Sequence, residues 1–272
     1  MESYQLVENV AFTVTFVVYI ISAVLFLVHV SGITKKLERV AMLITLIGFL
    51  FHTVAMVVRT LGAGRLPFSN QYEFALSFGW GIVLSFLVLH KMYKFSSIGA
   101  FVMPLGILVM GYASLQSRAV RPLMPALQSH WLTFHVGTAI LSYGAFALAC
   151  GIAVIYIIDS KRTSEKRILK DPEISDILSY RVIVFGLLML TIVIISGAIW
   201  AQKAWSRYWA WDPKETWSLI TWIIYAIYLH LRLRRNWRGK AAAWFAIIGF
   251  ISVLFTFVGV NILLPSIHSY AT

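Results

Sequence analysis

The chain has 272 residues, of which 60% are hydrophobic and 12% are charged, and its mean hydropathy is +0.80. Soluble domains carry about a quarter of charged residues, so this composition excludes an ordinary soluble protein. A formal net charge of +12 would suggest nucleic-acid binding in a soluble protein. Here the basic residues lie in short runs between apolar segments. We therefore expect the chain to be embedded in membrane lipid and to have no nucleic-acid partner.

Eight apolar segments come close to the length of about 20 residues that a membrane-spanning helix needs. Residues 1–8 lack the basic start of a cleavable signal peptide, so the first segment is predicted to be a retained helix. The fourth segment is short and contains Pro104, which spanning helices tolerate. In chain order the predicted spans are 9–31, 38–59, 72–93, 95–114, 131–158, 181–200, 215–233 and 241–262.

The basic residues predict how these spans are oriented. The links between successive spans fall into two alternating sets, one for each side of the membrane. Of the 23 lysines and arginines, 16 lie in or beside the links of one set, and seven lie in those of the other. Because the side richer in Lys and Arg is cytoplasmic, both termini are predicted to be extracytoplasmic. The sequence therefore predicts an all-α integral membrane protein with about eight transmembrane helices in one polytopic domain, 1–272.

Two of the outer links carry helix-start signals. Asn70 precedes Glu73 by three residues, as in a capping box, and Asp212 is followed by Pro213 and by Glu215, as at a capped helix start. The longest inner link, 159–180, mixes acidic and basic residues and is predicted to hold a short surface helix. The chain has one cysteine, so it has no CxxC pair for thiol exchange.

The third outer link is rich in tryptophan. Residues 200–222 read WAQKAWSRYWAWDPKETWSLITW and contain six of the ten tryptophans. Interfacial anchoring of helix ends accounts for Trp200 and Trp217, but less easily for a cluster within one loop. The alternative is a flat aromatic platform for a large planar ligand, because such rings stack with little loss of entropy. The candidate contacts are Trp200, Trp205, Tyr208, Trp209, Trp211, Trp217 and Trp222.

Basic residues interleave with these aromatic residues on the side where positive charge is otherwise sparse. Lys203, Arg207 and Lys214 would suit a planar ligand with carboxylate arms. Arg207 and Lys214 join the candidate contacts. Asp212 is a candidate as well, but its place at a helix start leaves a purely structural capping role equally open.

The outer histidines suggest what the planar ligand is. His135 begins the fifth span and His268 follows the eighth, so topology places both on the side of the aromatic loop, with His130. Two neutral imidazoles can bind haem iron from opposite faces of a porphyrin. His230 lies 15 residues beyond Glu215, or about 22 Å down the seventh span, at the depth of the inner leaflet.

Three further histidines lie at or near membrane depth. His52 lies within the second span, and His29 and His90 lie near inner helix ends. A histidine buried in a membrane is a functional candidate, but it is often an interhelical hydrogen-bonding group instead. Both interpretations stay open for His29 and His52, whereas His90 beside Lys91 indicates a solvated helix end.

These motifs resemble a known family. The stretch WAWDPKETWSLITW at 209–222, followed by IYAIYLHLR at 224–232, resembles the WWD signature of haem-handling proteins. More narrowly it is similar to the CcsA (ResC) subunit of the system II cytochrome c synthase. Segments 67–74, 135–143 and 260–270 carry the resemblance through most of the chain.

The resemblance implies a function in cytochrome c biogenesis. Haem, b-type in transit, would reach an outer WWD site at about 200–222 with His135 and His268 as axial ligands. His230 would ligate haem within the membrane, opposite a histidine of the CcsB (ResB) partner subunit. The synthase would then attach haem to the CxxCH motif of apocytochrome c through thioether bonds. No protein nucleophile is needed for that attachment, because orientation and effective concentration carry the reaction.

Two other functions stay open at this point. The chain could resemble CcmC, which hands haem to a chaperone without attaching it, or it could transport an unrelated planar substrate with tryptophans that only anchor helices. One position departs from the family pattern, since Ser206 stands where glycine is common. Serine would strain a loop that needs positive φ there. The expected location is a bacterial cytoplasmic membrane, with a thylakoid as the alternative.

Overall fold

The computed structural model describes residues 2–32, 37–163, 167–169 and 171–264, which contain helices and no strands. This agrees with the predicted all-α fold. The main helices are α1 (Glu2–Val30), α2 (Leu37–Ala63), α3 (Gln71–Tyr93), α4 (Gly99–Ser114), α5 (His130–Asp159), α6 (Pro172–Trp205), α7 (Pro213–Arg235) and α8 (Lys240–Leu254). Shorter segments are the 3₁₀ helix η1 (Pro125–Leu127), the π-helix η3 (Phe255–Gly259) and α9 (Val260–Leu263).

Six of the described helices are long and apolar enough to cross a membrane. They are α1, α2, α3, α5, α6 and the continuous stretch Lys240–Leu263. α4 is shorter, with 16 residues, and α7 has the length but carries His230, several aromatic residues and terminal arginines that lower its hydropathy. The model therefore supports a multi-pass membrane protein, while the count of eight spans and the orientation of the termini stay predictions.

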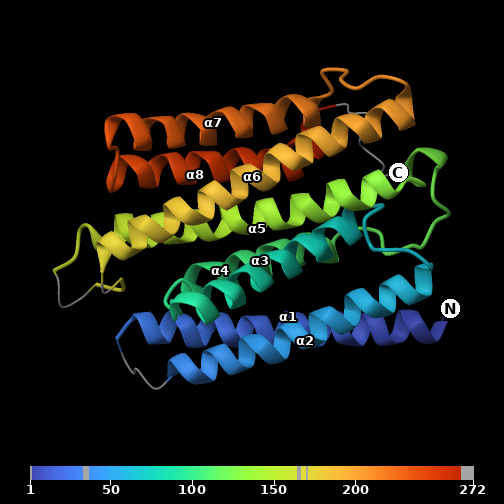
Figure 1. The fold of residues 1–272 in the computed structure, drawn as a ribbon. Coiled ribbons are helices and arrows are strands. Elements are labelled where there is room, and N and C mark those ends of the chain that lie inside the picture. Colours follow the sequence, from blue (N-terminus) through green and yellow to red (C-terminus); the bar gives the residue numbers. More distant parts are fainter. Residues whose placement is uncertain (1, 33–36, 164–166, 170, 265–272) are drawn as a thin grey trace. The chain divides into compact units, whose positions relative to one another are not determined.

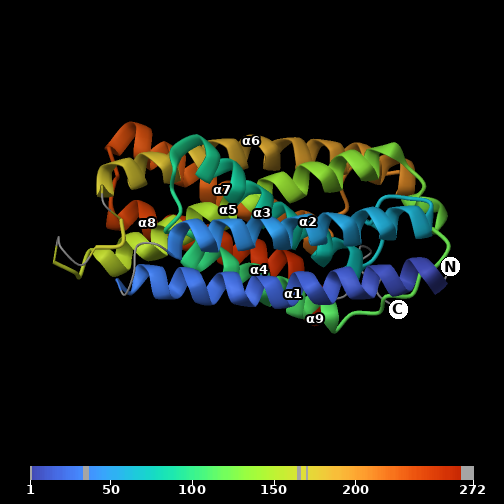
Figure 2. The same ribbon diagram turned by 90° about the horizontal axis from the view of Figure 1, so that it is seen from below.

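The helices group into two compact units. One comprises Met1–Val120 with Ser164–Ile168, and the other comprises Arg121–Thr163 with Leu169–Thr272. In the first unit, α1 packs against α2 and α4, and α3 packs against α4 (Figure 1). In the second, α5 runs beside α6 and also packs on α8, while α7 packs on α8 and α6 (Figures 1 and 2). The tryptophan-rich loop and all described candidate ligands belong to the second unit.

The predicted helix starts are confirmed, and one predicted helix is corrected. Asn70 Oδ1 accepts a hydrogen bond from the backbone of Glu73 at 2.8 Å, as its capping pattern predicts. No separate surface helix occurs among the described residues of the link 159–180. Instead α6 begins at Pro172 inside that link, capped by Asp171, and continues unbroken to Trp205. The last part of that link, from Pro172 on, is therefore the first part of this long helix.

His52 has a structural environment in the first unit. Its Nε2 lies 2.9 Å from the carbonyl oxygen of Leu76, and its Nδ1 lies 3.1 Å from the hydroxyl of Tyr19. A carbonyl can only accept, so Nε2 carries the proton and Nδ1 accepts from the tyrosine. Both ring nitrogens are thus satisfied in a fully buried site that joins α1, α2 and α3, which favours the interhelical interpretation.

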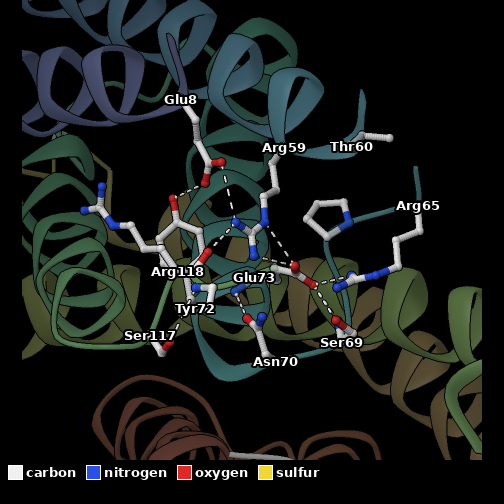
Figure 3. A network of polar contacts seen from close by, with 12 residues as sticks. Glu8, Arg59, Thr60, Arg65, Ser69, Asn70, Tyr72, Glu73, Ser117 and Arg118 are labelled. Atoms are coloured by element: carbon white, nitrogen blue, oxygen red, sulfur yellow. Dashed lines mark hydrogen bonds and ion pairs between the residues drawn. The ribbon is translucent and has the colours of Figure 1, made fainter. Parts of the chain in front are cut away.

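A buried charge network organises one end of the first unit. Glu73 is fully buried. One carboxylate oxygen accepts from Arg59 Nε at 3.0 Å and Nη2 at 2.8 Å, and the other accepts from Arg65 at 2.7 Å. The second oxygen also accepts from the backbone and the hydroxyl of Ser69 at 2.9 and 2.8 Å. Figure 3 shows these groups converging on the carboxylate. Glu73 therefore holds the α2–α3 link against both helices.

Arg59 extends this network to α1 and to the segment after α4. Its Nη1 donates to the backbone carbonyl of Arg118 at 2.7 Å and lies 3.6 Å from a carboxylate oxygen of Glu8. Glu8 in turn accepts from the Tyr72 hydroxyl at 2.7 Å, as Figure 3 shows. One guanidinium thus joins four parts of the unit that are distant in sequence. Glu73 was expected only as a capping residue, because one sequence does not reveal which charges converge.

We expect Glu73→Gln to destabilise the protein by about 3 kcal/mol, because removing one partner of a buried ion pair leaves the other charge uncompensated. The measurement is the free energy of unfolding in detergent. Glu2→Gln is the matched control, since Glu2 is exposed in the first turn of α1. Equal stability of the two variants would contradict a structural role for the network.

Candidate functional site

The imidazole of His135 is held against α6 by a hydrogen bond to the backbone of that helix. It lies on α5, and its Nδ1 is 2.9 Å from the carbonyl oxygen of Val193 on α6. Because that oxygen can only accept, Nδ1 carries the proton and Nε2 carries the lone pair. A backbone carbonyl that fixes the tautomer in this way is typical of metal-binding histidines. The hydrogen bond therefore gives the imidazole the orientation that such ligands have.

Gly197 makes this placement possible. A Cβ atom at position 197 would lie 2.8 Å from both Cε1 and Nδ1 of His135, closer than van der Waals contact permits. The absence of a side chain therefore lets the imidazole lie directly on α6. The sequence analysis named neither Gly197 nor Val193, because a glycine in an apolar helix gives no signal until its neighbour is known.

Trp200 forms the wall behind His135. The two rings stack at 6.1 Å with an interplanar angle of 23°, and Trp205 meets Trp200 edge-on at 4.8 Å. Trp200 is only 1% exposed, and its Nε1 donates to the carbonyl of Ala126 in η1 at 2.9 Å. This predicted contact residue therefore supports the histidine and lies behind the accessible surface.

The loop that follows α6 is strained at two places. Ser206 caps α6 at φ 58° and Trp211 has φ 57°, both in the left-handed region. A bulky residue there is a genuine outlier, and such strain clusters at functional sites. Trp211 is also 70% exposed and meets Trp209 edge-on at 5.7 Å. The loop thus holds a large apolar ring outward at a conformational cost.

The helix start after this loop is built by two acidic residues. Asp212 Oδ1 accepts from the backbone of Lys214 at 3.0 Å, and Glu215 Oε2 accepts from the backbones of Ala210 and Asp212 at 2.8 and 3.2 Å. The predicted capped helix start is confirmed, and it has the form of a capping box. Asp212 is buried, so the geometry favours its capping role. Glu215, which was expected only as the second half of the cap, also ties Ala210 within the loop to α7.

The remaining candidate contacts divide by exposure. Tyr208 and Arg207 are exposed. Trp217 packs on Phe255 of η3 at 4.1 Å, and Trp222 Nε1 donates to the Thr191 hydroxyl at 2.9 Å. The loop residues are therefore open to a ligand, whereas Trp217 and Trp222 fasten α7 to its neighbours.

Lys214 keeps a titratable charge beside the loop. It precedes the predicted span 215–233, and burial lowers the pKa of its ammonium to about 8, a shift that the Asp212 carboxylate opposes. The ammonium is therefore mostly charged at pH 7 and becomes neutral as the pH rises above about 8. An anion held by Lys214 would be bound more weakly in that range.

Of the three predicted iron ligands, the structure describes His135 and His230. His230 is exposed on α7, so its side chain faces away from the core of the second unit. His268 lies outside the described residues. Among those that are described, no three His, Cys, Asp or Glu side chains group as a metal site.

Ser206→Gly is expected to stabilise the end of α6 by about 1 kcal/mol, because glycine adopts positive φ without the penalty that other residues incur. The amide of residue 206, which donates to the carbonyl of Gln202 at 3.0 Å, should then exchange its hydrogen more slowly. Ser206→Ala is the control and should give no such protection. Faster exchange in the glycine variant would contradict the strain assigned to this position.

Comparison with known proteins identifies relatives over most of the chain. The model of the cytochrome C assembly protein family matches residues 68–268. The chain is 34% identical to the cytochrome c biogenesis protein CcsA of Guillardia theta over 96% of both chains. It is 37% identical to CcsA of Prochlorococcus marinus (strain NATL2A) over 81% of each.

A solved structure shares the fold. The cytochrome c heme lyase CcmF is similar with a TM-score of 0.72 and 18% sequence identity. The similarity covers 97% of this chain and 47% of that protein, so the chain spans about half of its length. At this identity the likeness concerns the arrangement of helices.

Proposed function

Because this chain belongs to the CcsA family of cytochrome c biogenesis proteins, we propose that it is the haem-handling subunit of a membrane cytochrome c synthase. Haem is then the substrate that the outer site presents to apocytochrome c. The observation that carries this proposal is the hydrogen bond from His135 Nδ1 to the Val193 carbonyl. It places a proton on Nδ1 and fixes the orientation of the ring, as a backbone carbonyl does for metal-binding histidines.

The proposed reaction needs positioning rather than a protein nucleophile. Each thiol of the CxxCH motif adds across one haem vinyl group, so a C–S bond forms, the thiol proton ends on carbon and no group leaves. Holding the two reactants in register can lower such a barrier substantially. The axial imidazole of His135, the exposed rings of Trp211 and Tyr208 and the partly exposed ring of Trp209 would hold the porphyrin. His268 is the proposed second axial ligand.

His230 suits a different task. It is an exposed imidazole in the part of α7 that is expected at inner-leaflet depth, where an ionisable side chain needs a partner. We assign it to b-type haem in transit, with the opposite ligand supplied by a CcsB (ResB) partner subunit. Activity is then expected only in the complex with that partner. The proposed topology has eight spans and two outer termini, in a bacterial cytoplasmic or thylakoid membrane.

His135→Ala is expected to lower haem retention by the purified complex about tenfold and to change the Soret and visible bands, because one axial ligand is lost. Added imidazole should restore the spectrum by filling the vacant position. Unchanged spectra and unchanged cytochrome c maturation in this variant would exclude His135 as a ligand. Haem retention without thioether formation in the wild-type complex would favour a CcmC-like transfer function instead.

Gly197→Ala tests the same assignment without removing the ligand. A methyl group there would press on the imidazole of His135 at 2.8 Å, so haem retention should fall although the histidine is intact. Gly137→Ala is the matched control, because a Cβ at this helical glycine of α5 meets nothing within 4 Å. Equal haem retention in the two variants would contradict the placement of His135 on α6.

His230→Ala is expected to abolish haem loading of the complex from the membrane site while leaving its assembly with the partner intact. The measurement is the haem-to-protein ratio of the co-purified complex. Leu233→Ala, an exposed α7 residue near His230, is the control for surface damage. Normal haem content in the His230 variant would remove this residue from the transit site.

A further inference from the structure

The second unit has a cavity next to Trp200, the residue that stacks on His135. It has a volume of about 310 Å³ and is enclosed by three parts of the chain: η1, the start of α5 and the end of α6. Its lining residues are Pro125, Ala126, Gln128, Ser129, His130, Trp131, Lys203 and Ala204. The hydrogen bond from Trp200 to Ala126 fastens η1 to α6, so one side of the cavity is anchored to the residue that stacks on His135.

The ionisable groups in this cavity favour an anion. Among the described residues, the titratable ones that line it are Lys203 and His130, and none of these lining residues is acidic. The Lys203 ammonium lies 5.9 Å from the centre of the Trp131 ring. No ion pair to Lys203 occurs in the part of the chain that the structure describes. A lysine held over an aromatic ring, without a carboxylate of its own, can bind an incoming carboxylate.

The cavity lies at a suitable distance from the proposed iron ligand. On α5, His130 precedes His135 by five residues, or about 7.5 Å along the helix axis. On α6, Lys203 follows Gly197, which contacts the imidazole, by six residues, or about 9 Å. Both helices therefore place the cavity on the same side of His135 and about as far from it as the edge of a porphyrin lies from a central iron.

The size of the cavity limits what it can hold. At about 310 Å³ it lies at the lower end of the range of about 300–1,000 Å³ that is typical of small-molecule sites. It fits an arm of a planar ligand better than the whole ring. Resting on the proposed function, we infer that this cavity binds a propionate carboxylate of haem, with Lys203 as the cation and His130 and Gln128 as further hydrogen-bonding groups.

This site fixes the rotation of haem about its axial ligands. Two axial imidazoles hold the iron but leave the ring free to turn about the bond between them. A carboxylate held at one edge removes this freedom, because the propionates and the vinyl groups occupy fixed positions on the macrocycle. Lys203 would then be a specificity-determining residue that decides which edge of haem faces the incoming thiols.

The test compares haem with its dimethyl ester, which lacks the two carboxylates, in the wild-type and Lys203→Gln complexes. In the wild type, native haem should bind about tenfold more tightly than the ester, because a charge-assisted hydrogen bond is lost on esterification. Lys203→Gln should lower the affinity for native haem about tenfold and leave that for the ester unchanged. Lys203→Arg should retain the preference, and Arg121→Gln, an exposed residue outside the cavity, is the control.

Three outcomes overturn the inference. Equal affinity of the wild type for haem and for the ester would exclude a carboxylate site. An equal loss for both ligands in Lys203→Gln would assign Lys203 a structural role instead, and an undiminished affinity for native haem in that variant would remove Lys203 from the site. The proposed function fails separately: it fails if the wild-type complex binds neither native haem nor its ester.

Discussion

A polar group in this mostly apolar chain must find its partner within the protein, because lipid offers none. Glu73 illustrates how strongly this constraint shapes the first unit. Its carboxylate accepts from two arginines and from Ser69, and Arg59 carries the network on to Glu8 and to the backbone at Arg118. The links at this end of the unit are therefore defined by charge, whereas apolar packing alone would leave their geometry loosely specified.

The same constraint orients His135 in the second unit. Its Nδ1 proton satisfies the carbonyl of Val193, and this bond fixes both the tautomer and the ring orientation. His52 is held in a similar way, since its ring nitrogens are engaged by Tyr19 and by the carbonyl of Leu76. Each of these two histidines is thus oriented by a backbone carbonyl of a neighbouring helix.

Sequence patterns predicted the helices well because apolar periods and caps are local. The starts of α3 and α7 follow from Asn70 and Asp212, which bond to residues two or three positions away. The parts that escaped prediction depend on contacts distant in sequence. Gly197 matters only because His135 lies on it, and the end of the link 159–180 was misassigned because Glu173 and Asp176 lie on the start of a long helix. The positive φ of Ser206 also escaped prediction, because a serine in a loop is compatible with either sign of φ.

The tryptophans of the outer loop separate into two groups that composition could not distinguish. Trp200, Trp217 and Trp222 are engaged with η1, η3 and α6, so they give the loop rigid supports. Trp211 has a strained backbone and an exposed ring, which a folded protein retains only where the surroundings enforce it. Glu215 supplies that enforcement by binding the backbone on both sides of Trp211. In the proposed function, such a rigid aromatic surface would lose little conformational freedom when it binds the planar haem.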